Sequence, residues 1–375
     1  MNVLQLIGSF HQGGSERQAV QLARLLRADG RVNVRIATLE NDGVLREEVE
    51  KLGLEEIPEF RLTSFYNVNF VKQLLKCANF LRASKIDVIH THDFYTNIFG
   101  MLAAQIVQVP LAVASKRETG GMRSRMQKRF EKFAFKQANA IVANSEAVKN
   151  YLVAEGVSKD KIKVVYNGLD LERLTPRLTD RRAICEEMGL PADENVKFIT
   201  MVANLRHEVK NQPMFLRAAA KVAPKFPNAH FVLAGEGARR AGLEKLAKDL
   251  NIAQNTHFTG RCALVPELLS ISYAGVLTSF NEGFSNAILE YMAASLPVVA
   301  TSVGGAGEAV IENETGFLIE SDNDEMLANR LIDLLEDEEK ARELGANGKK
   351  IAEEKFSCAA QLENTLKLYG ISSEF

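Results

Sequence analysis

The feature that most constrains this chain is an alternation of short apolar runs with amphipathic segments of helix length. In the first half, the runs VLQLI, VRIATL, DVIH, LAVA and AIVAN are separated by segments such as SERQAVQLARLLRADG. This alternation is typical of βαβ units, in which helices cover both faces of a parallel sheet. It therefore predicts an α/β protein.

A restart of the alternation predicts a second domain. The stretch VVYNGLDLERLTP ends a strand in an Asn-Gly turn, and the runs VKFITMVAN, AHFVLAG, THFTG, AGVLTS and PVVATS follow it. Because 375 residues suffice for two domains, we expect two doubly wound, Rossmann-like domains at residues 1–172 and 173–355. We expect the last segment, residues 356–375, to form a helix that returns to the first domain.

Charge and composition argue against several classes of protein. A formal net charge of −2 provides no basic field for gathering nucleic-acid phosphates. The cysteines lack the CxxC spacing of a structural zinc site and favour reduced thiols: Cys77, Cys185, Cys262 and Cys358. The N-terminus resembles a strand rather than a signal peptide, and Gln105, Gln108 and Pro110 interrupt the longest apolar segment. We therefore expect a cytoplasmic protein.

The loop after the first strand, GSFHQGGSERQ, has the character of an anion site. Gly13 and Gly14 allow a close approach of the backbone, and free N–H groups at the start of a helix attract phosphate. Ser15 and Gln18 have the spacing of a capping box. The loop is neither GxGxxG nor a P-loop, so a simple strand-to-helix turn is an equally good interpretation.

Two stretches of the second domain place charged residues on loops after strands. In VANLRHEVKNQ, Arg206 and Lys210 can clamp a diphosphate, although surface cations are often only solvated. In SFNEGFSNAILEYMAA, Glu282 precedes a helix and Glu290 lies two turns further along, where both can accept hydrogen bonds from sugar hydroxyls. The alternative is that neither glutamate binds a ligand: Glu282 would interact with the helix dipole, and Glu290 would be a solvated surface residue.

Taken in order, these stretches resemble the family-four retaining glycosyltransferases, which have two Rossmann-like domains facing across a cleft in the GT-B architecture. EGFSNAILE (282–290) resembles the family's E-x7-E motif, and GGSER (13–17) resembles its glycine loop. Arg206 and Lys210 resemble its diphosphate-binding pair, YNGLDLERLTP its interdomain linker, and ATSVGGAGEAV (300–310) the segment that closes its donor pocket. The resemblance covers nearly the whole chain. The strand end Val202-Ala203-Asn204-Leu205 departs from the family's VGRL-type run.

The resemblance implies a nucleoside diphosphate sugar as donor, with UDP favoured over GDP and no metal required. Arg206 and Lys210 would bind the pyrophosphate, Glu290 the ribose and Glu282 the transferred sugar. The remaining donor contacts implied are Gly13, Gly14, Gly260, Arg261, Gly283, Phe284 and Ser285. Attack on the face from which the diphosphate departs would need no dedicated nucleophile. The acceptor implied is a glycan or a lipid-linked glycan, as in synthesis of cell-surface polysaccharide.

The stretch HTHD ends a strand of the first domain and faces the same edge as the glycine loop. It lacks the downstream ligands of a metal site, so we expect no metal there. By resemblance, His92 takes part in catalysis, and Asp93 and Arg117 line the acceptor side; a polar turn is the alternative. Asp322-Asn323-Asp324 is formally a DxD motif, but its place before a helix favours an N-cap.

A basic amphipathic helix is expected at residues 122–137, where Met122, Met126, Phe130 and Phe133 recur at helical spacing among lysines and arginines. Such a helix is suited to contact with anionic lipids at the inner face of the membrane, although an ordinary core-facing helix fits equally well.

Two other functions stay open. The chain could be a nucleotide-sugar sensor or non-catalytic partner subunit, or it could be a nucleotide-sugar epimerase.

Overall fold

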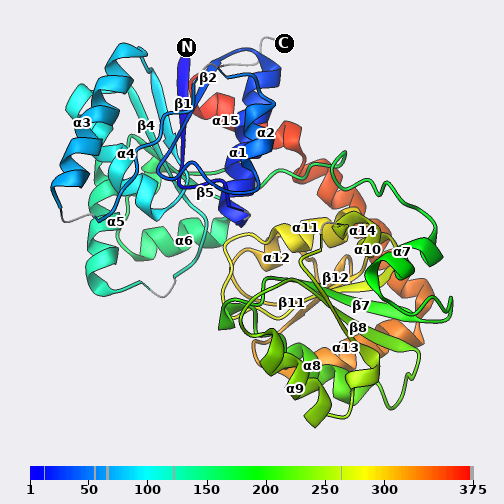
Figure 1. Cartoon of the computed structure of the whole chain (residues 1–375). Helices are drawn as coiled ribbons and strands as arrows, with labels where there is room; N and C mark the ends of the chain where they lie inside the picture. Colours follow the sequence, from blue (N-terminus) through cyan, green and yellow to red (C-terminus); the bar gives the residue numbers. More distant parts are fainter. Residues whose placement is uncertain (12, 55, 65–66, 121–122, 263, 372–375) are drawn as a thin grey trace. The chain divides into compact units, whose positions relative to one another are not determined.

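The computed structural model describes residues 1–375 except 12, 55, 65–66, 121–122, 263 and 372–375. It divides into two compact units, which we call unit 1 (Met1–Gly168 with Cys358–Phe375) and unit 2 (Leu169–Ser357). Each unit is a parallel sheet covered by helices on both faces (Figure 1), so the predicted α/β fold with two Rossmann-like domains is confirmed. The structural division falls at Gly168, where the sequence suggested residue 172.

Within the described residues, unit 1 contains a six-stranded parallel sheet with the order β2-β1-β3-β4-β5-β6. Its strands are β1 (Asn2–Ile7), β2 (Asn33–Thr38), β3 (Val88–Thr91), β4 (Leu111–Lys116), β5 (Ala140–Ala143) and β6 (Ile162–Val164). Its helices are α1 (Gly14–Asp29), α2 (Arg46–Glu50), α3 (Val68–Ala83), α4 (Phe94–Val107), α5 (Arg125–Gln137), α6 (Glu146–Ala154) and α15 (Cys358–Leu368). Strand β2 lies on one side of β1, and the chain then crosses to place β3 on the other side, so the strand order reverses at β1.

Alternating side chains of the unit 1 strands enter two separate cores. Leu4 and Leu6 pack with α3 to α6, whereas Val3 and Ile7 pack with α1, α2 and α15. The last helix, α15, lies against α1, where Gln361 Nε2 donates to Gln18 Oε1 at 2.9 Å. Helix α15 is therefore part of the hydrophobic layer that covers this face of the sheet.

The described part of unit 2 contains a second six-stranded parallel sheet, with the order β12-β11-β10-β7-β8-β9. Its strands are β7 (Lys197–Val202), β8 (Ala229–Ala234), β9 (Thr256–Gly260), β10 (Ser272–Leu277), β11 (Val298–Thr301) and β12 (Gly316–Ile319). Its helices are α7 (Arg181–Met188), α8 (Gln212–Val222), α9 (Arg240–Asp249), α10 (Val265–Ser270), α11 (Asn286–Ala293), α12 (Ala306–Ala309), α13 (Asp324–Glu336) and α14 (Glu338–Lys355).

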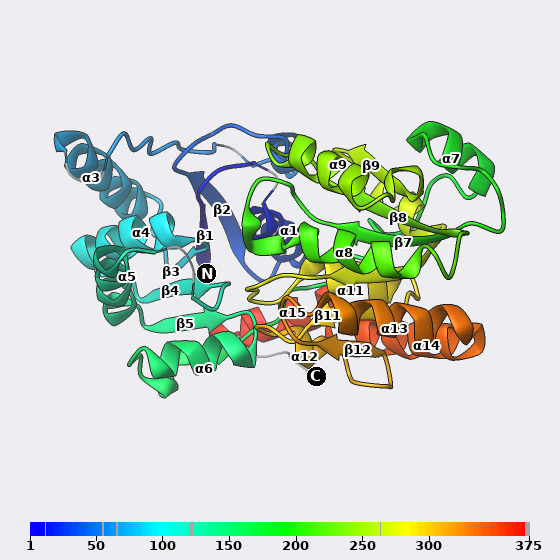
Figure 2. The same ribbon diagram turned by 90° about the horizontal axis from the view of Figure 1, so that it is seen from below.

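The helices of unit 2 form a layer on each face of its sheet. Helices α8, α9 and α13 cover one face, and α11 and α14 lie on the other (Figure 1). Figure 2 shows α13 and α14 running side by side at the edge of the sheet. Helix α11 packs tightly on β10, because the ring of Tyr291 lies directly against Gly275. A Cβ at residue 275 would lie 2.3 Å from Cγ of Tyr291. Only glycine fits at that position of the strand.

No helix in the described ranges is both long enough and apolar enough to cross a membrane.

Candidate functional site

The predicted donor residues of unit 2 lie where its strand order reverses. Strands β7 and β10 are neighbours in the sheet, although β8 and β9 separate them in sequence. The loop after β7 contains Arg206 and Lys210, and the loop after β10 contains Glu282. In doubly wound sheets, ligands bind beyond the carboxyl ends of the strands at this switch point. The fold therefore brings these residues to a position suited to a ligand.

Hydrogen bonds join the two loops directly. Thr278 Oγ1 lies 2.9 Å from the carbonyl oxygen of Lys210 and 3.0 Å from that of Asn211, and it donates to this pair of acceptors. Phe280 N–H donates to the carbonyl of Val209 at 2.8 Å. The backbone around Lys210 is thus held by the loop after β10.

The charged pair at this junction is Lys210 and Glu282. Lys210 Nζ lies 2.5 Å from Glu282 Oε1, and Ser279 Oγ donates to the same oxygen at 2.6 Å. The two charged side chains are 20% and 12% exposed, so both are largely removed from water. A pair of this kind keeps each charge in place, because removing one partner would leave the other partly buried and unpaired.

The segment 300–310 lies against the backbone of Glu282. Gly305 N–H donates to the carbonyl of Gly283 at 2.8 Å. Gly304 has a φ of +54°, and a Cβ there would lie 2.0 Å from the carbonyl oxygen of Glu282. Both the backbone conformation and the available space require glycine at 304. The geometry of the Glu282 loop thus depends on this glycine.

The helix that follows, α11, carries Glu290 toward the interior. Glu290 is 5% exposed, so the alternative of a solvated surface glutamate is wrong. Its neighbour Tyr291 accepts a hydrogen bond from Val202 N–H at 2.7 Å and donates to the carbonyl of Val276 at 3.2 Å. Tyr291 therefore ties α11 to the ends of both β7 and β10. In the sequence, the one sign of this role for Tyr291 is a hydroxyl in an apolar run.

The remaining predicted donor residues of unit 2 are placed less closely together. Phe284 and Ser285 are buried immediately before α11. Arg206 is exposed, and its guanidinium makes no hydrogen bond or ion pair with the described residues. Gly260 ends β9 with a φ of +68°, and Arg261 follows it at the surface. Strand β8 separates β9 from β7, so this last pair lies further along the same edge of the sheet.

In unit 1, the glycine loop follows β1 and the HTHD stretch ends β3, again at a reversal of strand order. Gly13 is the N-cap of α1, and a Cβ on it would lie 2.1 Å from Oε2 of Glu16. Burial raises the pKa of the Glu16 carboxyl, and the nearby Asp93 raises it further, while a hydrogen bond from its own backbone opposes both. Gly14 is the exposed first residue of the helix.

The predicted capping box of Ser15 and Gln18 is wrong. The helix begins two residues earlier than an N-cap at Ser15 implies, at Gly14, and its N-cap Gly13 has no side chain. The Gln18 side chain instead binds both backbone groups of Gly168, accepting from its N–H at 3.1 Å and donating to its carbonyl at 3.2 Å. The hydrogen bonds to Gly168 replace the bond to the backbone of Ser15 that a capping box would need. The sequence around α1 gives no sign of this distant partner.

His92, Asp93 and Arg117 lie close together in unit 1. His92 is 2% exposed, with Nε2 at 2.7 Å from Gln5 Oε1 and Nδ1 at 3.4 Å from Arg117 Nη2. Burial, with the nearby positive charge of Arg117 and the His90 ring, holds the His92 pKa well below its usual range. Asp93 caps α4 by accepting from the N–H groups of Tyr95 and Thr96, so it also has the structural role of a polar turn.

The formal DxD stretch is an N-cap, as expected. Asn323 Oδ1 accepts from Met326 N–H at 2.9 Å at the start of α13. The two flanking carboxylates, Asp322 and Asp324, both pair with Arg217. In the described ranges, no three His, Cys, Asp or Glu side chains are grouped so that they could hold a metal ion.

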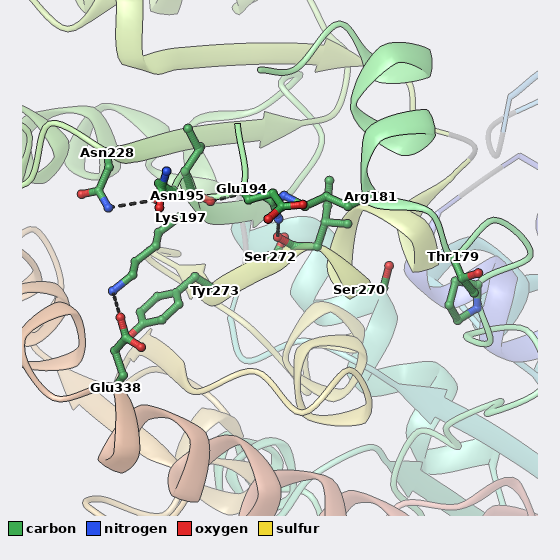
Figure 3. Close-up of a pocket in the computed structure, with 13 residues that line it drawn as sticks. Thr179, Arg181, Glu194, Asn195, Lys197, Asn228, Ser270, Ser272, Tyr273 and Glu338 are labelled. Carbon is green, nitrogen blue, oxygen red and sulfur yellow. Dashed lines mark hydrogen bonds and ion pairs between the residues drawn. The ribbon is translucent and has the colours of Figure 1, made fainter. Parts of the chain in front are cut away.

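A hollow of about 660 Å³ in unit 2 lies at the opposite edge of the sheet (Figure 3). Lys197 and Ser272, which line it, are the first residues of β7 and β10, so the hollow opens at the amino ends of the strands. Two of its charged side chains already have partners: Lys197 Nζ lies 2.5 Å from Glu338 Oε1, and the Arg181 guanidinium donates to the carbonyl of Val196 at 2.7 Å. It contains none of the predicted site residues.

Comparison with known families agrees with this geometry. The family described as "Glycosyl transferases group 1" matches residues 187–351, which contain the joined loops of unit 2. The family described as "Glycosyltransferase Family 4" matches residues 12–173, which make up most of unit 1.

Individual proteins show the same relationship. The Bacillus subtilis protein EpsD is 31% identical over 59% of this chain and 58% of its own length. The Escherichia coli UDP-Gal:alpha-D-GlcNAc-diphosphoundecaprenol alpha-1,3-galactosyltransferase is 29% identical over 71% of each chain. Anabaena HepE, crystallised in complex with UDP, superimposes with a TM-score of 0.86 at 22% identity, over 99% of this chain and 100% of HepE. The chain belongs to the group 1 glycosyltransferases.

Proposed function

We propose that this enzyme is a retaining glycosyltransferase that transfers a sugar from a nucleoside diphosphate sugar to a glycan or a lipid-linked glycan. The main support is the Lys210–Glu282 pair, 2.5 Å apart on two joined loops at the switch point of unit 2. The UDP complex of HepE and the UDP-Gal donor and diphosphoundecaprenol acceptor in the name of the Escherichia coli relative favour a UDP sugar and a lipid-linked acceptor.

The proposed reaction needs charge stabilisation more than it needs a nucleophile. The bond between the anomeric carbon and the diphosphate oxygen breaks, and the acceptor oxygen bonds to the same carbon on the same face. The acceptor proton passes to the departing phosphate oxygen. Arg206 and Lys210 would stabilise the negative charge that develops on the diphosphate, since preorganised cations need little reorganisation during the reaction. In this proposal no metal ion is required.

The two glutamates would bind hydroxyl groups. Glu282 is oriented by Lys210 and Ser279 and would accept hydrogen bonds from the transferred sugar. Glu290 is buried near the start of α11, and its carboxylate oxygens would accept hydrogen bonds from the two hydroxyls of a ribose. Phe284, Ser285, Gly260 and Arg261 remain proposed contacts to the donor.

Two other functions are tested by the same assays. A sensor or partner subunit would bind the donor without transferring its sugar, and it would not hydrolyse the donor even slowly. An epimerase would change the sugar of the donor with no acceptor present, which chromatography of the sugar product detects. The paired charges of Lys210 and Glu282 favour transfer over simple sensing, because catalysis requires preset charges near the leaving group.

Alanine at Arg206 or at Lys210 is expected to lower kcat by about a hundred- to thousandfold, the scale for loss of one preorganised charge stabiliser. Arg182→Ala is the control, because its side chain is 80% exposed on α7 and pairs with a neighbour four residues on, Glu186. Turnover is measured as release of nucleoside diphosphate with an acceptor present. Near-wild-type turnover in both variants would refute the proposed roles.

Gly304→Ala is expected to displace the backbone of Glu282 and to weaken donor binding at least tenfold. Gly307→Ala provides a matched control three residues away, where the nearest atom to a new Cβ would be Leu318 Cδ1 at 3.5 Å, an ordinary contact. The dissociation constant for the UDP sugar is measured by calorimetry for both variants. Equal affinities would show that the donor does not depend on the Glu282 loop.

We also propose that unit 1 contacts an anionic membrane at the inner face of the cell, where a lipid-linked acceptor would be found. Helix α5 exposes Met126 (61%), Phe130 (40%) and Phe133 (48%). Its exposed basic residues are Arg125, Arg129 and Lys136. Helix α4 lies between α5 and α3 (Figures 1 and 2), and α3 also exposes apolar side chains. Met122 lies outside the described residues, and the described helix begins at Arg125.

The double variant Phe130→Ser, Phe133→Ser is expected not to co-sediment with vesicles that contain anionic lipid. Arg129→Glu should weaken co-sedimentation in a salt-dependent way, since each basic residue near such a surface contributes about 1 kcal/mol. Val153→Ser on α6, exposed to a similar extent at 40%, serves as the control. Equal sedimentation of wild type and double variant would mean that α5 is an ordinary surface helix.

A further inference from the structure

Tyr369 places a hydroxyl from the C-terminal segment inside a buried polar network of unit 1. The residue directly follows α15 and is 2% exposed. Its hydroxyl accepts from Gln5 Nε2 at 3.0 Å and lies 2.7 Å from His90 Nδ1. Its ring stands edge-on to that of His90, with centroids 5.9 Å apart. Nothing in the proposed reaction requires this hydroxyl to touch a substrate.

The Gln5 amide is held between Tyr369 and His92. Gln5 is fully buried in β1, and its amide nitrogen needs an acceptor, which Tyr369 supplies. The amide oxygen therefore faces the other way, 2.7 Å from His92 Nε2. Because a carbonyl oxygen can only accept, His92 must carry its proton on Nε2. The geometry thus assigns one neutral tautomer to His92, with a lone pair on Nδ1.

That lone pair faces a guanidinium. His92 Nδ1 lies 3.4 Å from Arg117 Nη2, and Arg117 Nη1 donates to Asn167 Oδ1 at 2.9 Å. In the part of the chain that the structure describes, Arg117 forms no ion pair with a carboxylate, and its buried Nε has no hydrogen-bond partner. Burial lowers the pKa of Arg117 to about 10, so it stays charged near neutral pH. A guanidinium held by neutral acceptors keeps its charge available to a ligand.

We propose that Tyr369 is a positioning residue for the acceptor side of the reaction. Through Gln5 and His92, it holds the guanidinium of Arg117 in the orientation that binds the acceptor. His92 then acts through its Nδ1 lone pair on Arg117 and removes no proton from a substrate. This inference rests on the proposed function, because it assumes that Arg117 contacts an acceptor.

Three variants separate this role from others. Tyr369→Phe removes only the hydroxyl. His92→Asn places its Oδ1 near the former position of Nδ1, so it can still accept from Arg117. His92→Gln places its amide near the former position of Nε2 and cannot. Tyr151→Phe, a partly exposed tyrosine on α6, is the control for loss of a hydroxyl.

The full-length variants are compared in acceptor KM, kcat, UDP affinity and melting temperature. Tyr369→Phe should raise the acceptor KM about tenfold with UDP affinity unchanged within about twofold. The variant would release Gln5 and so cost the His92–Arg117 hydrogen bond, and one hydrogen bond to a charged group corresponds to roughly this factor. His92→Asn should stay within about threefold of wild type, and His92→Gln should lose about tenfold. Equal losses in both His92 variants, or an unchanged KM in Tyr369→Phe, would overturn the proposal.

A spectroscopic measurement tests the network without any acceptor. In protein with ¹⁵N-labelled histidine, long-range correlation spectra show which ring nitrogen carries the proton, and His92→Asn identifies the signal of residue 92. Wild type should show the Nε2–H tautomer alone, and Tyr369→Phe should lose that single state. A proton on Nδ1 in wild type would overturn the proposal. If the tautomer is as expected but no acceptor is ever glycosylated, the proposed function fails while the network stands.

Discussion

The pairing of β7 with β10 is the constraint on which the candidate site of unit 2 depends. These strands lie 70 residues apart in sequence, and the parallel sheet makes them neighbours with their carboxyl ends at one edge. The loops that follow are then joined through Thr278 and Phe280, which brings Lys210 and Glu282 together. Tyr291 and Gly304 hold the surrounding backbone. Each of these contacts would be lost if the two strands were separated.

Unit 1 relies on a different kind of constraint. Two inner strands of its sheet, β1 and β3, contain buried polar side chains that need hydrogen-bond partners within the protein, because water does not reach them. Gln5, His90 and Tyr369 satisfy one another in this way, and His92 extends the series to Arg117. A network of this kind allows few alternative orientations. It is therefore a means of fixing one half-buried cation, Arg117, by way of groups in the core.

Much of the fold could be predicted from local sequence, because strand and helix patterns have different periods and the alternation repeats in both units. The places of Lys210 and Glu282 also followed, since parallel strands bring their carboxyl ends to one edge. Local sequence could not show contacts between residues that lie far apart in the chain. Gln18 suggested a capping box but binds Gly168, 150 residues away, and Gln5 meets Tyr369 across 364 residues.

The central claim is that unit 2 binds a nucleoside diphosphate through Arg206 and Lys210 without a metal ion. Calorimetric titration of UDP, in the presence of a chelator, tests it most directly. The account predicts saturable binding to the wild type and affinity lowered about tenfold or more in Lys210→Ala, because a charge-assisted hydrogen bond is lost. No binding at millimolar UDP, binding only after addition of a divalent ion, or equal affinity in Lys210→Ala would contradict it.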